Sequence, residues 1–359
     1  MPGTQVESRR ELFDYFQKNI ERSYESLSED QELEHRQNLL KTFIIESNVE
    51  IKEFLTSFNV EKTKEIDSKL VKVLVEGEVE FFIDFSNPRF WLFYTLSKSR
   101  PSKRVIEKFM SYVRSGLDHP WMPIKLQEEF TELGEFRGLG AKYKPKKIFP
   151  EKYIEDKLSF GDLSIRSWGR GSQDLYDVLK GEKTEEFFSL SSIGIKRWGE
   201  GDDFILEDIG FDGRFTTRGG NSVQLHLDTV EQIVDGYSNL LETIENKHRI
   251  TYQSKDEKIE IEGDPIVIDL KNEIENIEEF ISYIVSSENP LRLWGLKTEI
   301  EEDYFKVKGI DLHNGDKYTM EMTPKWIRLY LPEAACGNTA LRIFVNLQRY
   351  YDSSAEMEI

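Results

Sequence analysis

The stretch PKWIRLYLPEAACGNTALRIFVNLQRYYD, from Pro324 to Asp352, decides the fold that the sequence predicts. Its alternating apolar residues indicate a strand, and the helical spacing after the Gly-Asn-Thr run at 337–339 indicates a helix. A weaker copy lies at 213–237 (GRFTTRGGNSVQLHLDTVEQIVDGY), where a strand again runs through Gly-Asn-Ser into an amphipathic helix. Such recurrence indicates an internal repeat, which is evidence about the fold and not about a chemical function.

The order of the expected elements extends this repeat over the second half of the chain. From residue 157 the pattern predicts a strand, a short helix, three strands and a long helix at 221–245. The next block predicts a hairpin, a strand, a helix at 274–287, four strands and the closing helix. The sequence therefore predicts an internal duplication of a β-α-β(3-4)-α module.

This order, a strand, a helix, antiparallel strands and a final helix occurring twice, resembles the saddle of TATA-binding-protein-like domains. The resemblance covers residues 158–352 and is one of topology. It implies a saddle-shaped sheet, but no activity and no DNA-contacting residue is carried over, because topology of this kind hosts unrelated functions.

The first half of the chain predicts a different arrangement. Helical spacing over 7–58 indicates an N-terminal helical hairpin, whose second helix carries a broad apolar stripe that includes Leu39, Phe43 and Phe54. The hairpin either packs on the body of the protein or serves as a partner-binding arm. Three strands and a helix follow. The fold class expected is α+β, with antiparallel sheets and covering helices, and the domains expected are 1–60, 61–150, 151–248 and 249–359.

Composition narrows the classes of function. The chain has 359 residues, 48 Lys and Arg against 67 Asp and Glu, and a formal charge of −19, which disfavours phosphate backbones and anionic membranes unless a local basic patch overcomes it. Excess carboxylate also has the simpler role of keeping a protein soluble. One cysteine excludes a disulfide framework, and no apolar run is long enough for a membrane span. We expect a soluble, cytoplasmic protein.

The most suggestive candidate site lies at the start of the helix near residue 221. Backbone N–H groups at a helix start, glycines and two guanidinium groups are able to bind a phosphate or carboxylate. The alternative is a glycine turn with an Asn or Ser cap and no ligand. The candidate ligand-binding residues are Arg214, Arg218, Gly219, Gly220, Asn221 and Ser222.

Cys336 occupies the corresponding place in the second copy. A thiol with a lowered pKa would act there as a nucleophile, with His226 or His313 as its base, whereas a small buried cysteine needs no such partner. The five histidines show no metal-ligand spacing, and carboxylate pairs are too common to be informative. We expect no metal, no cofactor and no catalytic residue.

A basic run is the second candidate, for binding nucleic acid. Four lysines with Tyr143 and Phe149 interleaved have the composition of a nucleic-acid contact, although a solvated linker has it as well. The run consists of Lys142, Lys144, Lys146 and Lys147. Arginines beside tryptophans, such as Arg166 beside Trp168, are a further possibility for stacking on bases.

Three functions remain open. Because no catalytic motif is assembled, we expect a non-catalytic binding or scaffolding protein that recognises a protein partner on an open sheet face. Nucleic-acid binding is the first alternative, and an enzyme acting on a phosphorylated ligand is the second. The chemistry of the open sheet face distinguishes the first two functions, because an apolar face favours a protein partner and a basic one favours nucleic acid.

Overall fold

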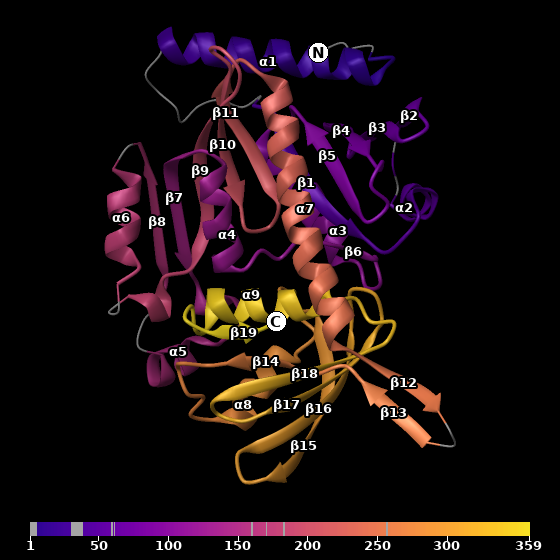
Figure 1. The fold of residues 1–359 in the computed structure, drawn as a ribbon, viewed down its shortest axis with the longest axis vertical. Coiled ribbons are helices and arrows are strands. Elements are labelled where there is room, and N and C mark those ends of the chain that lie inside the picture. Colours follow the sequence, from indigo (N-terminus) through magenta and orange to yellow (C-terminus); the bar gives the residue numbers. More distant parts are fainter. Residues whose placement is uncertain are drawn as a thin grey trace.

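The computed structural model describes residues 6–29, 39–58, 60, 62–158, 161–169, 171–181, 184–255 and 258–359. Two antiparallel sheets and nine α-helices lie within these ranges (Figure 1), so the predicted α+β class with antiparallel sheets and covering helices is confirmed. None of the helices in these ranges combines the length and the apolar composition needed to cross a membrane.

The helices cover both sheets. They are α1 (Arg9–Glu29), α2 (Ile51–Ser57), α3 (Ser99–Ser111), α4 (Ile124–Phe130), α5 (Glu151–Lys157), α6 (Ser172–Leu179), α7 (Val223–His248), α8 (Ile277–Ile284) and α9 (Asn338–Tyr350). Short 3-10 turns are η2 (Thr131–Leu133), η3 (Pro145–Lys147) and η4 (Glu185–Phe187).

The large sheet collects strands from the first two thirds of the chain. They are β1 (Lys41–Ser47), β2 (Lys62–Asp67), β3 (Leu70–Val75), β4 (Val79–Asp84), β5 (Phe90–Thr95), β6 (Leu117–Asp118), β7 (Glu135–Tyr143), β8 (Leu163–Trp168), β9 (Leu190–Trp198), β10 (Phe204–Gly210) and β11 (Arg214–Gly220). The strand order is β2-β3-β4-β5-β1-β11-β10-β9-β7-β8, with β6 beside β1. Because β1 pairs with both β5 and β11, it joins the N-terminal strands to those of the following block.

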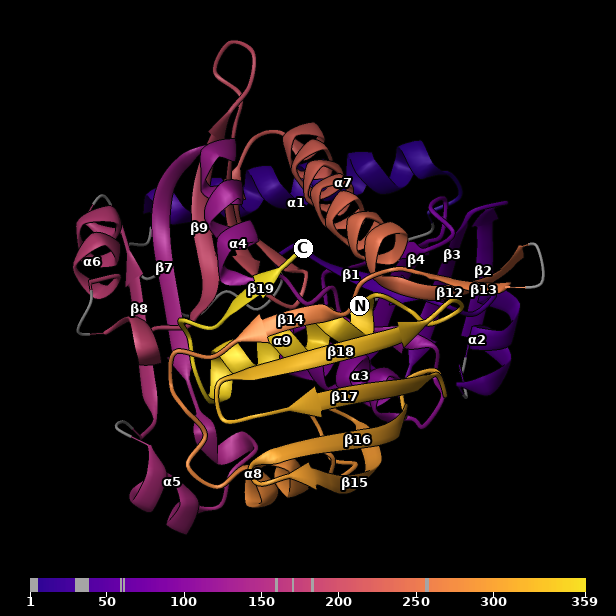
Figure 2. The same ribbon diagram turned by 60° about the horizontal axis from the view of Figure 1, so that its bottom comes forward.

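The small sheet is built from the C-terminal block (Figure 2). Its strands are β12 (Arg249–Lys255), β13 (Lys258–Glu262), β14 (Ile266–Asp269), β15 (Leu293–Glu301), β16 (Tyr304–Asp311), β17 (Lys317–Met322), β18 (Trp326–Pro332) and β19 (Glu356–Glu358). The meander β15-β16-β17-β18 continues through β14 to β19, and the hairpin of β12 and β13 branches from the end of β18.

The element order of the two C-terminal blocks is as predicted, yet the internal duplication and the TATA-binding-protein-like saddle are not confirmed. In the small sheet the strand before the first helix of the block, β14, pairs with the last strand, β18. In the large sheet the place beside the last strand, β11, is taken by β1, and β8 lies at the far edge beside β7. Strands β1 and β7 are thus inserted among the strands of the first block, and the two blocks pair their strands differently.

The N-terminal helical hairpin needs correction. Helix α1 is present, but Lys41–Ser47 form strand β1 instead of the second helix, and 30–38 lie outside the described residues. All seven residues of β1 are buried. Its apolar run covers only residues 43–45, and burial on both faces removes the alternation that marks a strand, so periodicity alone does not distinguish it from part of a buried helix.

Helix α9 lies between the two sheets (Figure 1). Every residue from Asn338 to Arg349 is buried, although Arg342, Asn346 and other polar residues are among them. Arg342 donates a hydrogen bond to Asp118 of β6 and forms an ion pair with Asp311 of β16, while its Nε donates to the carbonyl of Leu291 at 3.0 Å. One buried guanidinium group thus ties the large sheet to the small one.

The two carboxylates of this cluster are held in their charged form. Burial alone would raise the pKa of Asp118, but Arg342 and the neighbouring cations lower it to about 2. The pKa of Asp311 is lowered as well, because Arg342 outweighs the effect of burial. Both partners therefore remain ionised at neutral pH, and removal of the arginine would leave two buried charges without compensation.

We predict that Arg342→Met lowers the free energy of unfolding by about 3–5 kcal/mol, the usual effect of breaking a buried ion pair. Equilibrium denaturation in urea measures it. Arg104→Met is the matched control, because exposed Arg104 pairs with Glu76 and Glu78 at the surface and should cost no more than about 1 kcal/mol. Equal losses in the two variants would contradict a role of Arg342 in joining the sheets.

Candidate functional site

Two hollows in the described part of the chain hold charged side chains. The first, of about 540 Å³, is called the cysteine pocket here and is lined by Ser47, Asn48, Pro88, Arg89, Arg249, Asn314, Asp316, Ala334 and Cys336. The second, of about 1570 Å³, is the basic cleft. It is lined by Leu39, Lys41, Phe43, Ser99, Arg100, Pro101, Lys103, Arg104, Glu107, Arg166, Trp168, Leu206, Asp208, Arg214, Thr216 and Arg218.

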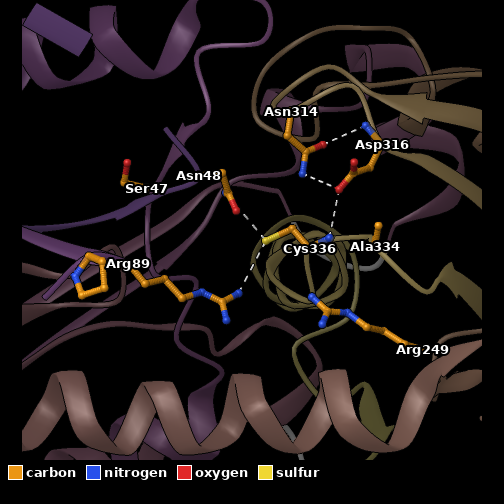
Figure 3. Close-up of a pocket in the computed structure, with 9 residues that line it drawn as sticks. Ser47, Asn48, Arg89, Arg249, Asn314, Asp316, Ala334 and Cys336 are labelled. Atoms are coloured by element: carbon orange, nitrogen blue, oxygen red, sulfur yellow. Dashed lines mark hydrogen bonds between the residues drawn. The ribbon is translucent and has the colours of Figure 1, made fainter. Parts of the chain in front are cut away.

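The cysteine pocket lies where α9 begins (Figure 3). Arg89 reaches from the loop before β5 toward the thiol of Cys336, with its Nη2 3.8 Å from Sγ. The backbone N–H of Cys336 donates to Asp316 at 3.0 Å, and the Nε of Arg249 donates to the carbonyl of Ala335 at 2.8 Å. Residues of both sheets therefore meet at the start of this helix.

The charges of the cysteine pocket are matched. Arg89 bonds both Glu46 and Glu245, and Arg249 pairs with Glu245 at 3.0 Å. Burial alone would raise the pKa of Glu245, but hydrogen bonds from Arg89 and the N–H of Gly337 lower it. Arginines that are already satisfied by carboxylates have little left to offer a ligand, so this network serves mainly to position α9.

The thiol of Cys336 is not activated. It is 4% exposed and donates to Glu46 Oε1 at 3.1 Å, and burial together with the Glu46 charge raises its pKa well above the ordinary value. Among the described residues, neither His226 nor His313 forms a hydrogen bond with it. A nucleophilic cysteine requires the opposite shift of its pKa, which favours a structural cysteine.

The basic cleft arises from the alternation of β11. Phe215 packs against His226 of α7, so the side chains of Arg214 and Arg218 lie on the opposite face of the large sheet. That face is covered by α2 and α3 over β1 and β5, where Phe54 contacts Trp91. Over β11 and β10 no such core covers it in the described residues, and the exposed face forms the floor of the cleft.

One carboxylate organises the far side of the cleft. Asp208 of β10 accepts hydrogen bonds from Arg166 and Arg218, each at 2.7 Å. The guanidinium group of Arg218 lies 5.2 Å from the centre of the Trp168 ring, which is 37% exposed. Gly194 of β9 leaves room for this indole, since a Cβ there would lie 2.7 Å from it. An aromatic ring is thus held at the rim between two arginines.

Lys41 on β1 is a buried cation in the same cleft. Its Nζ donates to the carbonyls of Leu39 and Ser97 at 2.7 and 2.8 Å, and the side chain forms no ion pair with a described carboxylate. Burial lowers the pKa of Lys41 to about 8. A buried ammonium group without a counter-ion is costly, and a bound anion would stabilise its charge.

The other cations between α3 and β11 differ in whether a carboxylate of the protein pairs with them. Lys103 pairs with Glu107, and Arg104 bonds Glu76 and Glu78. By contrast, Arg100 forms no ion pair within the part of the chain that the structure describes. Arg214 has no direct ion pair there either, but its charge acts on Asp212: desolvation alone would raise the pKa of that carboxyl, and Arg214 together with other cations lowers it to about 2. Unmatched positive charge therefore accumulates between α3 and β11.

The residues of the predicted helix-start site lie in different places in the structure. Arg214 and Arg218 line the cleft, but Gly219 and Gly220 are paired with β10. Asn221 accepts from the N–H of Phe204, and Ser222 is a buried N-cap without a side-chain cap bond. The first N–H of the helix, that of Val223, donates to the side chain of Gln17 at 2.7 Å. This helix start is therefore occupied by α1.

The four lysines of the predicted basic run also lie on different elements. Lys142 lies on β7 on the face of the cleft, and desolvation and the nearby cations Lys103 and Arg214 lower its pKa. Lys146 and Lys147 belong to η3, which Lys144 precedes, and Lys146 pairs with Glu151 at 3.2 Å. The structure thus brings Lys142 near Arg214 and turns the rest of the run elsewhere.

Sequence reasoning missed Lys41, Arg100 and Lys103 as parts of a site. The sequence predicts a helix at Lys41, and the other two belong to α3, which the sequence predicts only as a helix that follows three strands. A lysine two residues before the apolar run at 43–45 is the one signal that was present, because a buried lysine needs a polar partner or a functional reason.

We predict that Cys336 is unreactive in the native protein. At neutral pH its raised pKa and burial should keep alkylation by iodoacetamide at least tenfold slower than in the protein unfolded in urea, as followed by mass spectrometry. Arg89→Gln should leave the native thiol unreactive if the cysteine is structural. Rapid native alkylation would instead support the nucleophile hypothesis.

The comparisons with known proteins place the chain in a family. The family model described as MJECL33-like protein matches residues 1–359. A relative from Methanocaldococcus jannaschii, "Uncharacterized protein MJECL33", is 33% identical over 392 residues, covering 99% of this chain and 94% of the relative. Neither description names a ligand or a reaction. The chain belongs to the MJECL33-like protein family.

Proposed function

We propose that this protein binds a single strand of nucleic acid in the basic cleft. The observation that carries the proposal is a reversal of charge: seven lysines and arginines and two carboxylates line the cleft of a chain whose formal charge is −19. Phosphate backbones are held mainly by such local positive fields. A basic sheet face favours nucleic acid as the partner, whereas an apolar face would have favoured a protein.

The distribution of partners supports a ligand with several phosphates. Asp208 is shared by two arginines, and Arg104 is held by glutamates outside the cleft, so these charges are partly neutralised. Arg100 and Lys41 have no ion-pair partner among the described residues, and Arg214 is compensated only at longer range by Asp212. An anion that runs along the floor would pair with cations that the protein itself leaves unmatched.

The shape of the cleft favours a single strand. Small-molecule pockets occupy about 300–1,000 Å³, whereas this cleft measures about 1570 Å³. Trp168 offers a partly exposed ring at the rim, and a base stacked on an aromatic ring typically contributes about 1–3 kcal/mol. Stacking of this kind requires unpaired bases, which a duplex does not present.

The catalytic alternative gains no support from the same geometry. An enzyme acting on a phosphorylated ligand at residues 214–222 would use the helix start, but Val223 N donates to Gln17 and Gln17 Nε2 donates to the carbonyl of Asn221. The proposal therefore keeps Arg214, Arg218 and Lys142 as binding residues and assigns no catalytic residue. Scaffolding of a protein partner remains a hypothesis for other faces of the molecule.

We predict that Arg100→Gln and Arg214→Gln each weaken binding of a fluorescein-labelled oligothymidylate by about 5- to 30-fold, which corresponds to about 1–2 kcal/mol for one charged contact. Fluorescence anisotropy at low salt measures the affinity. Lys146→Gln removes the same charge from a lysine paired with Glu151 and should leave the affinity unchanged.

Salt dependence provides a second readout of the same contacts. For single strands the logarithmic slope is about −0.7 per phosphate contact, so each cleft variant should flatten it by about that amount. If the wild-type protein retained no oligonucleotide at low salt, or if the control lost as much affinity as the cleft variants, the proposed function would be wrong.

We also predict a pH dependence that comes from Lys41. Its pKa of about 8 means that the ammonium group is charged below this pH and neutral above it, so oligothymidylate binding should weaken as the pH rises from about 7 to about 9.5. Lys41→Met should bind more weakly at about pH 7 and lose this dependence. A parallel decline in wild type and variant would show that another group is responsible.

A further inference from the structure

The edges of the two sheets differ in how they are protected. Strand β2, one edge of the large sheet, has charged residues at four of its six positions, and β19 has only three residues. Strand β15, an edge of the small sheet, has nine residues and pairs only with β16 along its length. Short or charged edges resist pairing with another chain, whereas long apolar edges invite it.

Strand β15 exposes large apolar side chains between charged ones. Trp294, Leu296 and Ile300 are 45%, 66% and 49% exposed. The first two residues of the strand are covered by residues 286 and 287, because Ser286 bridges Trp294 and the N–H of Ser287 donates to Leu293. Residues 295–301 have no strand beside them on the outer side within the described residues (Figure 2).

We propose that two copies of this chain form a symmetric dimer by antiparallel pairing of β15 with β15. A two-fold axis perpendicular to the sheet would place Thr298 opposite Thr298 of the partner subunit. Lys297 then faces Glu299 of the partner subunit, and Leu296 faces Ile300 of the partner subunit. Each pair away from the axis occurs twice, so one short segment supplies two opposite-charge pairs and two apolar pairs.

Neighbouring registers are worse. A two-fold axis preserves the two faces of the sheet, so only residues of the same parity lie opposite each other. Centring the axis on Lys297 would place the two lysines opposite each other, and centring it on Glu299 would do the same with two glutamates. Like charges directly opposite destabilise a sheet, which leaves the Thr298 register as the complementary one.

The surroundings of β15 fit this arrangement. Lys297 is held toward α8 by Ser282 and Glu278, at 2.9 and 3.0 Å, so its position on that face of the sheet is defined. Glu299 forms no ion pair with any described residue and is exposed. The ladder with β16 becomes irregular at Ile300, between Glu299 and Glu301, so the proposed pairing ends with the pair of Leu296 and Ile300.

The test uses a cysteine at the symmetry axis. Opposite residues of an antiparallel pair have Cα atoms about 4.5–5.5 Å apart, within the range of about 4.4–6.8 Å that a disulfide spans. Thr298→Cys should therefore yield a covalent dimer on a non-reducing gel after mild oxidation. The native Cys336 is buried and should not interfere.

Lys308→Cys is the matched control. Lys308 is exposed on β16 opposite Leu296, so its copies in the dimer would be separated by three strand spacings, about 14 Å across the sheet. They would also be offset by four residues, about 13 Å, along the strands, which makes the separation about 20 Å. It should stay monomeric on the gel. Leu296→Glu, a substitution at an exposed site, should shift the wild-type dimer to a monomer in size-exclusion chromatography with light scattering, without a change in circular dichroism.

Each outcome decides the proposal. Cross-linking of Thr298→Cys but not of Lys308→Cys, with dissociation by Leu296→Glu, would support it. A wild-type protein that remains monomeric at high micromolar concentration would overturn it. A dimer that neither cross-links at 298 nor responds to Leu296→Glu would overturn it as well, because another surface would then hold the two copies together.

Discussion

The position of α9 depends on one buried guanidinium group. Arg342 lies on a helix that is buried on all sides, and it reaches Asp118 in the large sheet and Asp311 in the small sheet at the same time. Removing a charge from water is costly, so such a residue persists only where carboxylates and carbonyls compensate it fully. The relative position of the two sheets follows from that requirement, because both carboxylates must meet the same side chain.

The same requirement separates the two hollows. At the start of α9, Arg89 and Arg249 are matched by Glu46 and Glu245, and the N–H of Gly337 is satisfied by the latter carboxylate. This network is internal, as the raised pKa of the Cys336 thiol also indicates. In the basic cleft the cations exceed the carboxylates, and Lys41 has only carbonyl partners. Unmatched charge, more than hollow volume, therefore distinguishes a candidate binding surface from a structural junction.

Local patterns in the sequence predicted which elements form better than they predicted which strands pair with each other. The strands and helices after residue 160 appear in the expected order, and α9 begins at Asn338 as its Gly-Asn-Thr start indicated. Strand β1 was mistaken for a helix because its seven residues are buried on both faces. The pairing of β1 with β11 joins residues such as Lys41 and Thr216, and no local pattern contains information on contacts at that separation. The cleft depends on this pairing. The sequence therefore indicated only separate candidates near it, which were Arg166, Arg214, Arg218 and Lys142.

Net charge and local charge have different consequences for such a protein. An acidic exterior repels polyanions at distances beyond about 8–10 Å only weakly in physiological salt, since the Debye length is of that order. At contact distance the cleft dominates, because its cations lie on a partly buried sheet face where screening is weaker. The acidic remainder then disfavours binding anywhere else on the surface. Under the proposed function, a chain with a formal charge of −19 would restrict a nucleic-acid strand to one face, which a uniformly basic protein would not.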